Sequence, residues 1–352
     1  MRLLIVKLSS IGDVVQGLAV LEPLRPLCSH LGWVVEAPGL PLVDGHPLID
    51  RVHVFPKEEL RRKVRGGGII AALGRLRDEL HAERYDAVLD LQGLFKSAVV
   101  VALSGARRRV GFAATRELAW LALSERVSPG REERHAVLKY LELARHLGGR
   151  IGQVRFPVHV LPEEERRVEE LLADAAHAGG GGEIVTVCPR TRWESKQWPP
   201  ERFAHVAAAL VRELGARVVL AGGEADKPVA EAIRDAAGQD VIEDVINLAG
   251  DLTLREFAHL CRLSRLVISC DSGPMHLAAA VEAPVVAIFG PTAPWRTGPF
   301  GAAHRVVRKG LTCSPCFRKH CASRACMEAV TEADVLAAAR GLWEAFPRAY
   351  PA

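Results

Sequence analysis

The sequence predicts an α/β protein of two domains, each built on a parallel β-sheet, and three observations support this fold class. Short apolar runs of strand length alternate with stretches of helical spacing along most of the chain. A polar, glycine-rich segment near the middle interrupts this alternation, which then starts again. With 352 residues, of which 49% are hydrophobic, the chain is large enough to bury two cores.

The first domain is expected to cover residues 1–160. Its first strand is the apolar run Arg2 to Val6, and a loop of turn residues follows it. Asp13 to Leu27 then carries apolar side chains at helical spacing, so we expect one helix there. The further strands expected in this domain are 33–37, 52–55, 87–91 and 109–112.

Residues 161–182 are interpreted as a linker region, because they combine a charged helix with a run of four glycines. The second domain, residues 183–330, repeats the alternation of strands and helices. Its expected strands are 184–188, 217–221, 245–248, 265–270 and 284–289. Residues 331–352 are expected to close the chain with a helix.

Composition excludes several classes of protein. A net charge of +4 is too small to predict a nucleic-acid partner. No apolar run is long enough for a transmembrane helix, and Met1 to Leu8 lacks the features of a signal peptide. We therefore expect a cytoplasmic protein, with a membrane surface as a place where it could work. Its eight cysteines are then expected to be mostly free thiols.

The polar loop Asp271-Ser-Gly-Pro-Met-His276 follows a buried strand, and a helix is expected to begin at Ser272 or Gly273. A helix N-terminus presents backbone N–H groups and the positive end of the helix dipole, so this edge suits a phosphate group. An ordinary strand-loop-helix turn with an aspartate cap explains the same residues equally well.

Asp13 lies in the first turn of the first expected helix, at the open edge of the sheet. The residues alone favour a simple first-turn acid, with a general base as the alternative. The chain has neither a dinucleotide-binding fingerprint nor a Walker A sequence, so hydride transfer and P-loop phosphotransfer lose support. Polar loops at the carboxyl edges of both sheets predict a ligand in a cleft between the domains.

Five motifs in this order resemble those of the lipopolysaccharide heptosyltransferases of glycosyltransferase family 9. They are Lys7-Leu-Ser-Ser-Ile-Gly-Asp-Val-Val15, Asp90-Leu-Gln-Gly-Leu-Phe-Lys-Ser97, Lys196-Gln-Trp-Pro199, Asp271-Ser-Gly-Pro-Met-His276 and Phe289-Gly-Pro-Thr292. The resemblance spans nearly the whole chain and implies a GT-B fold of two Rossmann-like domains facing across a cleft. It also implies that the helix at 331–352 packs back on the N-terminal domain.

The resemblance implies an activity as well. The first two motifs and Thr115-Arg-Glu117 are most similar to heptosyltransferase I, which moves heptose from ADP-heptose to the Kdo of lipid A in the lipopolysaccharide inner core. The implied transfer inverts the anomeric centre and needs no metal or other cofactor. Work on a lipid acceptor places the protein at the inner face of the inner membrane. The alternatives are heptosyltransferase II, a GT-B nucleotide-sugar epimerase and a non-catalytic nucleotide-sugar binding protein.

The family's functional residues carry over position by position. Asp13 matches the catalytic base. The donor-binding matches are Thr191, Arg192, Lys196, Asp271, Ser272, Gly273 and His276. On the acceptor side, the resemblance places five basic residues near loops that the family uses for the anionic Kdo and lipid A phosphates: Arg61, Arg62, Lys63, Lys96 and Arg116. The family's ribose-binding acid does not align cleanly, because Lys227 occupies the nearest position, and Glu224 or Asp226 is expected to substitute for it.

Four cysteines lie close together near the end of the second domain. They are Cys313, Cys316, Cys321 and Cys326. Four thiolates in a short loop can form a zinc or iron-sulfur site. We expect instead a structural loop with free thiols or a disulfide, because the spacing alone favours that interpretation.

Overall fold

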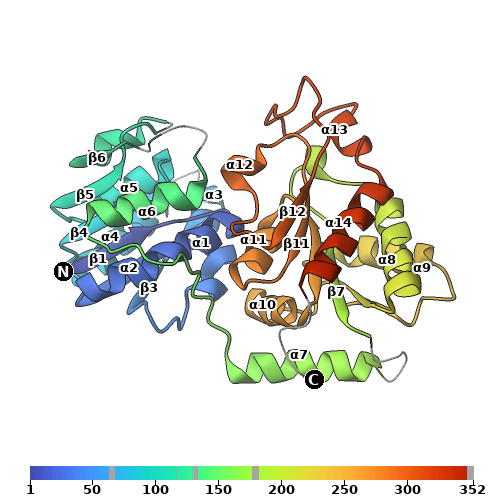
Figure 1. Ribbon diagram of the computed structural model, residues 1–352. Coiled ribbons are helices and arrows are strands. Elements are labelled where there is room, and N and C mark those ends of the chain that lie inside the picture. The colour runs from blue at the N-terminus through green and yellow to red at the C-terminus, as the bar shows by residue number, and fades with distance from the viewer. Residues whose placement is uncertain (63–67, 116, 129, 131–133, 177–181, 347–352) are drawn as a thin grey trace. The chain divides into compact units, whose positions relative to one another are not determined.

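The computed structural model describes residues 1–62, 68–115, 117–128, 130, 134–176 and 182–346. It divides the chain into two compact units, Met1–His159 and Val160–Ala352 (Figure 1). Each unit is built around a parallel sheet of six strands, so the predicted α/β fold class is confirmed. The two units are described in turn.

The sheet of the first unit has the strand order β3-β2-β1-β4-β5-β6, and every pair is parallel. The strands are β1 (Arg2–Val6), β2 (His30–Glu36), β3 (Arg51–Phe55), β4 (Ala87–Asp90), β5 (Arg108–Phe112) and β6 (Glu125–Val127). The central strand β1 is buried except for its first residue, because a parallel sheet with helices on both faces hides its middle strands from water.

The helices of the first unit are α1 (Ile11–Gly17), α2 (Leu21–Leu24), α3 (Lys57–Arg62), α4 (Gly68–Ala82), α5 (Phe95–Leu103) and α6 (Ala136–His146). The prediction of a single helix from Asp13 to Leu27 is wrong. Short 3₁₀ turns at Leu18–Val20 and Arg25–Leu27 divide it. Two prolines, Pro23 and Pro26, lack the backbone N–H that a continuous helix needs and crowd the preceding turn.

The sheet of the second unit has the order β12-β11-β10-β7-β8-β9, again with parallel pairs. Its strands are β7 (Ile184–Cys188), β8 (Arg217–Leu220), β9 (Val245–Asn247), β10 (Leu266–Cys270), β11 (Val285–Ile288) and β12 (His304–Val307). Numbered within its own unit, each sheet therefore has the order 3-2-1-4-5-6 of a Rossmann fold.

The helices of the second unit are α7 (Pro162–Ala176), α8 (Pro200–Leu214), α9 (Lys227–Ala237), α10 (Leu254–Leu263), α11 (Gly273–Ala280), α12 (Pro294–Thr297), α13 (Ala325–Glu328) and α14 (Glu332–Ala345). Helix α7 occupies most of the expected linker region but packs on α10 (Figure 1). Arg167 pairs with Glu256 at 2.8 Å, and Arg255 pairs with Glu164 at 2.9 Å. Residues 177–181 of the expected linker lie outside the described residues.

The resemblance implied that helix α14 packs on the N-terminal domain, and this stays a prediction. Within the second unit, Val335, Ala339 and Leu342 of α14 are buried in the core. The helix lies against α8 and against β10, β11 and β12. Its apolar face thus covers the sheet that immediately precedes it in the chain. Among all the helices that the structure describes, none is both long and apolar enough to cross a membrane.

Candidate active site

The strand order of each sheet reverses at one point, and several of the predicted site residues follow the strands on either side of these two points. In the first unit the reversal lies between β1 and β4, and in the second between β7 and β10. Loops that leave such neighbouring strands turn to opposite faces of the sheet and leave a crevice at its carboxyl edge. Asp13 and Lys96 follow β1 and β4, while Lys196 and Asp271 follow β7 and β10.

In the second unit, Lys196 and Asp271 form a closely paired cation and anion. Lys196 Nζ lies 2.7 Å from Asp271 Oδ2, and the hydroxyl of Thr292 donates to the same oxygen at 2.6 Å. The Lys196 ammonium also lies 4.4 Å from the centre of the Trp193 ring. Because Asp271 is almost fully buried while Lys196 is partly exposed, this neutral pair holds the Lys196 ammonium in a fixed position at the crevice.

Helix α11 begins beside this pair, at Gly273, and confirms the helix start expected from the sequence. Ser272 is its N-cap residue, and its side chain makes no capping hydrogen bond. The Ser272 hydroxyl instead lies 3.0 Å from that of Ser269. The side chain of Ser272 therefore leaves the first backbone N–H groups of α11 to other acceptors, and His276 lies in the same first turn.

The other donor-side candidates differ in how they are held. The Thr191 hydroxyl donates to the Trp193 carbonyl at 2.8 Å and is mostly buried, so it shapes the loop, whereas Arg192 is exposed. Of the two proposed ribose acids, Asp226 accepts a hydrogen bond from the Gly223 N–H at 2.9 Å. Glu224 is exposed at the carboxyl edge of β8, which makes it the more accessible of the two.

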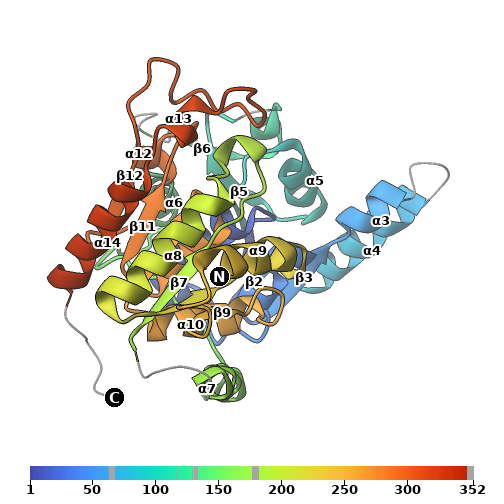
Figure 2. The same ribbon diagram turned by 90° about the vertical axis from the view of Figure 1, so that its right-hand side faces the viewer.

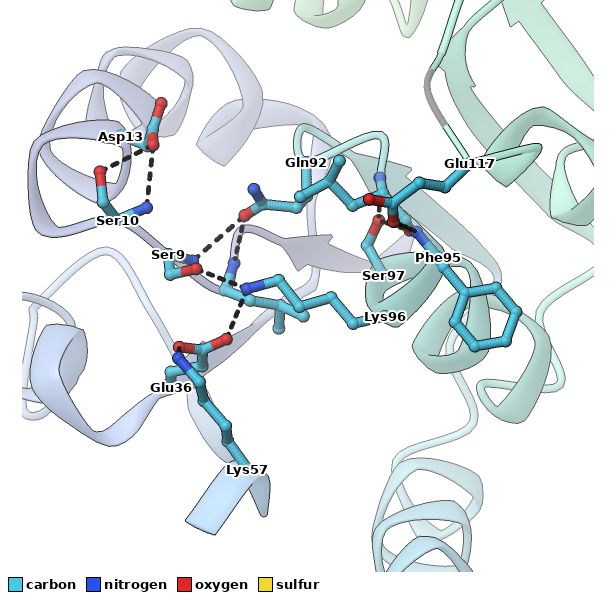
Figure 3. Close-up of polar contacts among 12 residues, drawn as sticks. Ser9, Ser10, Asp13, Glu36, Lys57, Gln92, Phe95, Lys96, Ser97 and Glu117 are labelled. Atoms are coloured by element: carbon cyan, nitrogen blue, oxygen red, sulfur yellow. Dashed lines mark hydrogen bonds and ion pairs between the residues drawn. The ribbon is translucent and has the colours of Figure 1, made fainter. Parts of the chain in front are cut away.

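In the first unit, Asp13 occupies the third position of α1 (Figure 3). Its Oδ2 accepts hydrogen bonds from the backbone N–H and the hydroxyl of Ser10, both at 2.8 Å. Its Oδ1 lies 3.7 Å from Lys7 Nζ. The Asp13 side chain is 38% exposed, so the carboxylate is both oriented and reachable from solvent.

Lys7 is a buried cation that the sequence interpretation missed. Its ammonium donates to the Leu91 carbonyl at 3.1 Å and to the Tyr140 hydroxyl at 2.8 Å. Burial acts to lower the pKa of Lys7, but Asp13, Tyr140 and Asp90 outweigh it and leave the pKa raised. Lys7 therefore stays charged behind Asp13. The signal in the sequence was the position of Lys7, directly after the apolar strand Arg2–Val6.

A second missed feature surrounds Lys96, which the resemblance placed on the acceptor side (Figure 3). Lys96 Nζ lies 2.5 Å from both the Ser9 hydroxyl and Glu36 Oε1, and Lys57 Nζ lies 2.6 Å from Glu36 Oε2. Burial acts to raise the pKa of Glu36, but Lys57 and Lys96 outweigh it and lower the pKa. Gln92 Oε1 accepts from the Ser9 N–H at 3.1 Å and steadies the loop.

The structure describes only some of the remaining acceptor-side candidates. Arg61 lies on α3, is 72% exposed and pairs with Glu58 at 3.7 Å. Figure 2 shows α3 and α4 side by side next to β3. Arg62 is the last residue of α3, and its side chain is not described. Lys63 and Arg116 lie outside the described residues.

The cysteine cluster holds thiols without a disulfide. All eight cysteines are unpaired with one another in the structure. Within the described part of the chain, no three His, Cys, Asp or Glu side chains are grouped so that they could hold a metal ion. Burial raises the pKa of the Cys326 thiol, and the nearby Cys316 raises it further. Hydrogen bonds from Arg324 and Ser323 lower the pKa of the Cys321 thiol.

Comparison with known proteins identifies the family to which the chain belongs. The model of glycosyltransferase family 9 (heptosyltransferase) matches residues 73–326. Lipopolysaccharide heptosyltransferase 1 of Pseudomonas aeruginosa is 31% identical over 329 residues, covering 91% of this chain and 87% of that protein. Lipooligosaccharide heptosyltransferase 2 of Haemophilus influenzae is 28% identical, covering 88% of each chain.

A solved Escherichia coli heptosyltransferase with ADP superposes with a TM-score of 0.76 at 26% identity, covering 97% of this chain and 100% of that one. A second structure of it holds ADP-2-deoxy-2-fluoro heptose. These findings agree with the five motifs and with the two Rossmann-type sheets. The chain belongs to glycosyltransferase family 9, the heptosyltransferases, and is a glycosyltransferase of lipopolysaccharide biosynthesis.

Proposed function

We propose that this enzyme transfers L-glycero-D-manno-heptose from ADP-heptose to the Kdo of lipid A, with inversion at the anomeric carbon. One observation carries the proposal: each crevice contains the kind of group that one half of this reaction needs. The second unit offers a fixed cation at a helix start, and the first offers an oriented carboxylate.

The second unit is proposed to bind the donor. The related E. coli enzyme was solved with ADP and with a fluorinated ADP-heptose, which supports the same donor for this chain. Lys196 and the first turn of α11 would face the diphosphate, with Ser272, Gly273 and His276 in contact with it. Negative charge grows on the diphosphate as its bond to the sugar breaks, so fixed positive groups lower the barrier. Lys196 and α11 supply this stabilisation in a reaction that needs no metal.

The first unit is proposed to bind the acceptor, with Asp13 as general base. The acceptor hydroxyl oxygen forms a bond to the anomeric carbon while the bond from that carbon to the ADP oxygen breaks. The proton of the acceptor hydroxyl passes to Asp13, and the electron pair of the broken bond leaves with ADP. The hydrogen bonds from Ser10 hold the carboxylate in one orientation, which favours attack along one direction.

The choice of Kdo as acceptor rests on sequence motifs. Asp90 to Ser97 and Thr115 to Glu117 are most similar to heptosyltransferase I. Identity to curated relatives is similar for the two types, at 29% for the E. coli type 1 enzyme and 28% for the H. influenzae type 2 enzyme. Heptosyltransferase II, with the first heptose as acceptor, is therefore the second candidate. With either lipid acceptor, we propose that the enzyme works at the inner face of the inner membrane.

Release of ADP from ADP-heptose tests the proposal. The assay is run without acceptor, with heptose-free Kdo-lipid A, and with lipid that already carries one heptose, followed by mass analysis of the lipid. We expect ADP release and one added heptose only with the Kdo acceptor. Release only with the heptosylated lipid would move the assignment to heptosyltransferase II. A changed sugar without any acceptor would indicate an epimerase.

A further inference from the structure

A long loop of the second unit, residues 308–324, connects β12 to α13 and contains neither helix nor strand (Figure 1). It carries Cys313, Cys316 and Cys321 and is called here the cysteine loop. Ordered loops of more than about 12–15 residues without secondary structure are uncommon and are usually functional. The proposed function assigns this loop no role, yet its backbone is bonded to two segments of the donor crevice.

The first of these segments directly precedes Lys196. Ser195 donates its hydroxyl to the Arg318 carbonyl at 2.6 Å and its backbone N–H to the Lys319 carbonyl at 3.2 Å. Ser195 is also buried, with 1% of its surface exposed. Two hydrogen bonds to successive carbonyls fix both the position and the direction of a residue, because each bond is directional. The cysteine loop therefore fixes the point at which Lys196 leaves the backbone.

The second segment follows β11. The backbone N–H groups of Cys316 and Phe317 donate to the Pro291 carbonyl at 3.0 and 2.8 Å. Thr292 is the next residue, and its hydroxyl donates to the Asp271 carboxylate at 2.6 Å. The cysteine loop is thus bonded beside both partners of the buried ion pair at the donor crevice.

The turn that contains Lys196 depends on contacts from outside itself. It is one short 3₁₀ helix, η5 (Glu194–Lys196), and its N-cap residue Trp193 makes no capping hydrogen bond with its side chain. A single helical turn is not stable alone. The Trp193 ring centre lies 4.4 Å from Lys196 Nζ and 5.7 Å from Lys319 Nζ, so a side chain of the cysteine loop also contacts this turn.

We propose that Ser195 is a positioning residue, through which the cysteine loop holds the Lys196 ammonium where the donor diphosphate binds. This inference rests on the proposed function, because it takes Lys196 as a cation that contacts the diphosphate of ADP-heptose. Lysine has a long, flexible side chain, and ordering it around a ligand costs entropy. Because Ser195 fixes the start of that side chain, it lowers this cost and increases the affinity for the donor.

The variant Ser195→Ala tests the role, with Ser264→Ala as a matched control. Ser264 is also a buried serine of the second unit, and its hydroxyl donates to the Leu260 carbonyl at 2.7 Å. It lies before the amino end of β10, whereas the donor crevice lies at the carboxyl edge. Loss of one hydrogen bond should lower the ADP affinity of Ser195→Ala about fivefold, and the affinity of Ser264→Ala should stay unchanged.

The kinetic readout follows the same division. In Ser195→Ala the KM for ADP-heptose should rise and the KM for the acceptor should stay unchanged, while both serine variants should melt at a lower temperature than the wild type. An unchanged ADP affinity in folded Ser195→Ala would overturn the positioning role, and so would an equal loss of ADP affinity in Ser264→Ala.

A double-mutant cycle shows whether Ser195 acts through Lys196. Ser195→Ala is combined with Lys196→Met, and ADP affinity is measured by calorimetry, or by ligand-detected NMR where binding is weak. We expect Ser195→Ala to cause no further loss when the ammonium is absent. A fivefold loss in both backgrounds would mean that Ser195 supports the whole crevice, and it would overturn the positioning role.

ADP binding needs no acceptor, so it separates this inference from the proposed function. If the two variants are coupled in ADP binding but the wild type transfers no heptose to any lipid, the proposed function fails and the positioning role stands. If transfer is normal and the two variants act independently on ADP affinity, the positioning role fails and the function stands.

Discussion

Replacing Glu36 by Gln should destabilise the first unit strongly for a single polar substitution. The change leaves two ammonium groups, 2.5 and 2.6 Å from the former carboxylate, without their counter-charge. Removing one partner of a buried ion pair typically costs about 3–5 kcal/mol. Because the lysines are about one third exposed, water screens part of this loss, and we expect a decrease of about 2 kcal/mol in the free energy of unfolding.

The Glu36 carboxylate should also make the stability of the protein depend on pH. The pKa of Glu36 is lowered by its two lysines, so its contribution to stability is complete above the ordinary glutamate pKa of 4.5. That contribution is lost as the pH falls from 4.5 through the lowered value. The difference in stability between the wild type and Glu36→Gln should therefore be constant near neutral pH and shrink below pH 4.5.

Urea unfolding at several pH values measures both effects, with Glu125→Gln as the control. Glu125 lies on β6 of the same sheet and pairs with Arg108 at 2.6 Å, but both side chains are at least one third exposed. Glu125→Gln should cost about 1 kcal/mol, because water screens the contacts of Glu125 with Arg108 and His146. If Glu36→Gln costs no more than Glu125→Gln, or if its cost does not change below pH 4.5, the account of the buried carboxylate is wrong.

Three further predictions concern the donor site, the metal and the C-terminal helix. Lys196→Met should raise the KM for ADP-heptose and lower kcat by about tenfold to a hundredfold, because the diphosphate loses a fixed cation. Steady-state kinetics would show this effect, and an unchanged donor KM would contradict it. Dialysis against EDTA should leave the rate of ADP release unchanged, whereas recovery that needs added Mg²⁺ would contradict the metal-independent proposal. Asp334→Ala should lower the free energy of unfolding by about 1 kcal/mol, because Asp334 accepts a hydrogen bond from the Thr331 N–H at 2.8 Å in the N-terminal capping box of α14. Thermal unfolding measures this loss, and no loss would mean that the cap is not stabilising.

Most buried strands could be predicted from the sequence, because a parallel strand covered on both faces is a continuous apolar run. Ile184–Cys188 matches its expected bounds, and Leu266–Cys270 differs by one residue. The edge strands β6 and β12 were missed. They are three and four residues long, and most of their side chains are at least partly exposed, so they carry no apolar pattern.

The candidate site could be predicted only in part, for a related reason. The motifs located Lys196 and Asp271 at strand ends, but their 2.7 Å pairing depends on β7 and β10 being neighbours in the sheet. The partners of Glu36 likewise follow β3 and β4, which lie on opposite sides of β2 and β1 in the sheet. Strand order is a property of the whole sheet, and local sequence does not contain it. The same limit applies to α14, because its apolar positions do not state that it packs on α8 and on β10, β11 and β12.

The Asp13→Asn variant tests the central claim most directly. Asparagine keeps an oxygen that can accept from Ser10, so the start of α1 should survive, but it cannot take a proton from the acceptor. ADP-heptose binding is measured by calorimetry, and ADP release is measured with Kdo-lipid A. We predict unchanged donor affinity and a fall in kcat of about a hundredfold to ten-thousandfold. Turnover at the wild-type rate would contradict the assignment of Asp13 as the base.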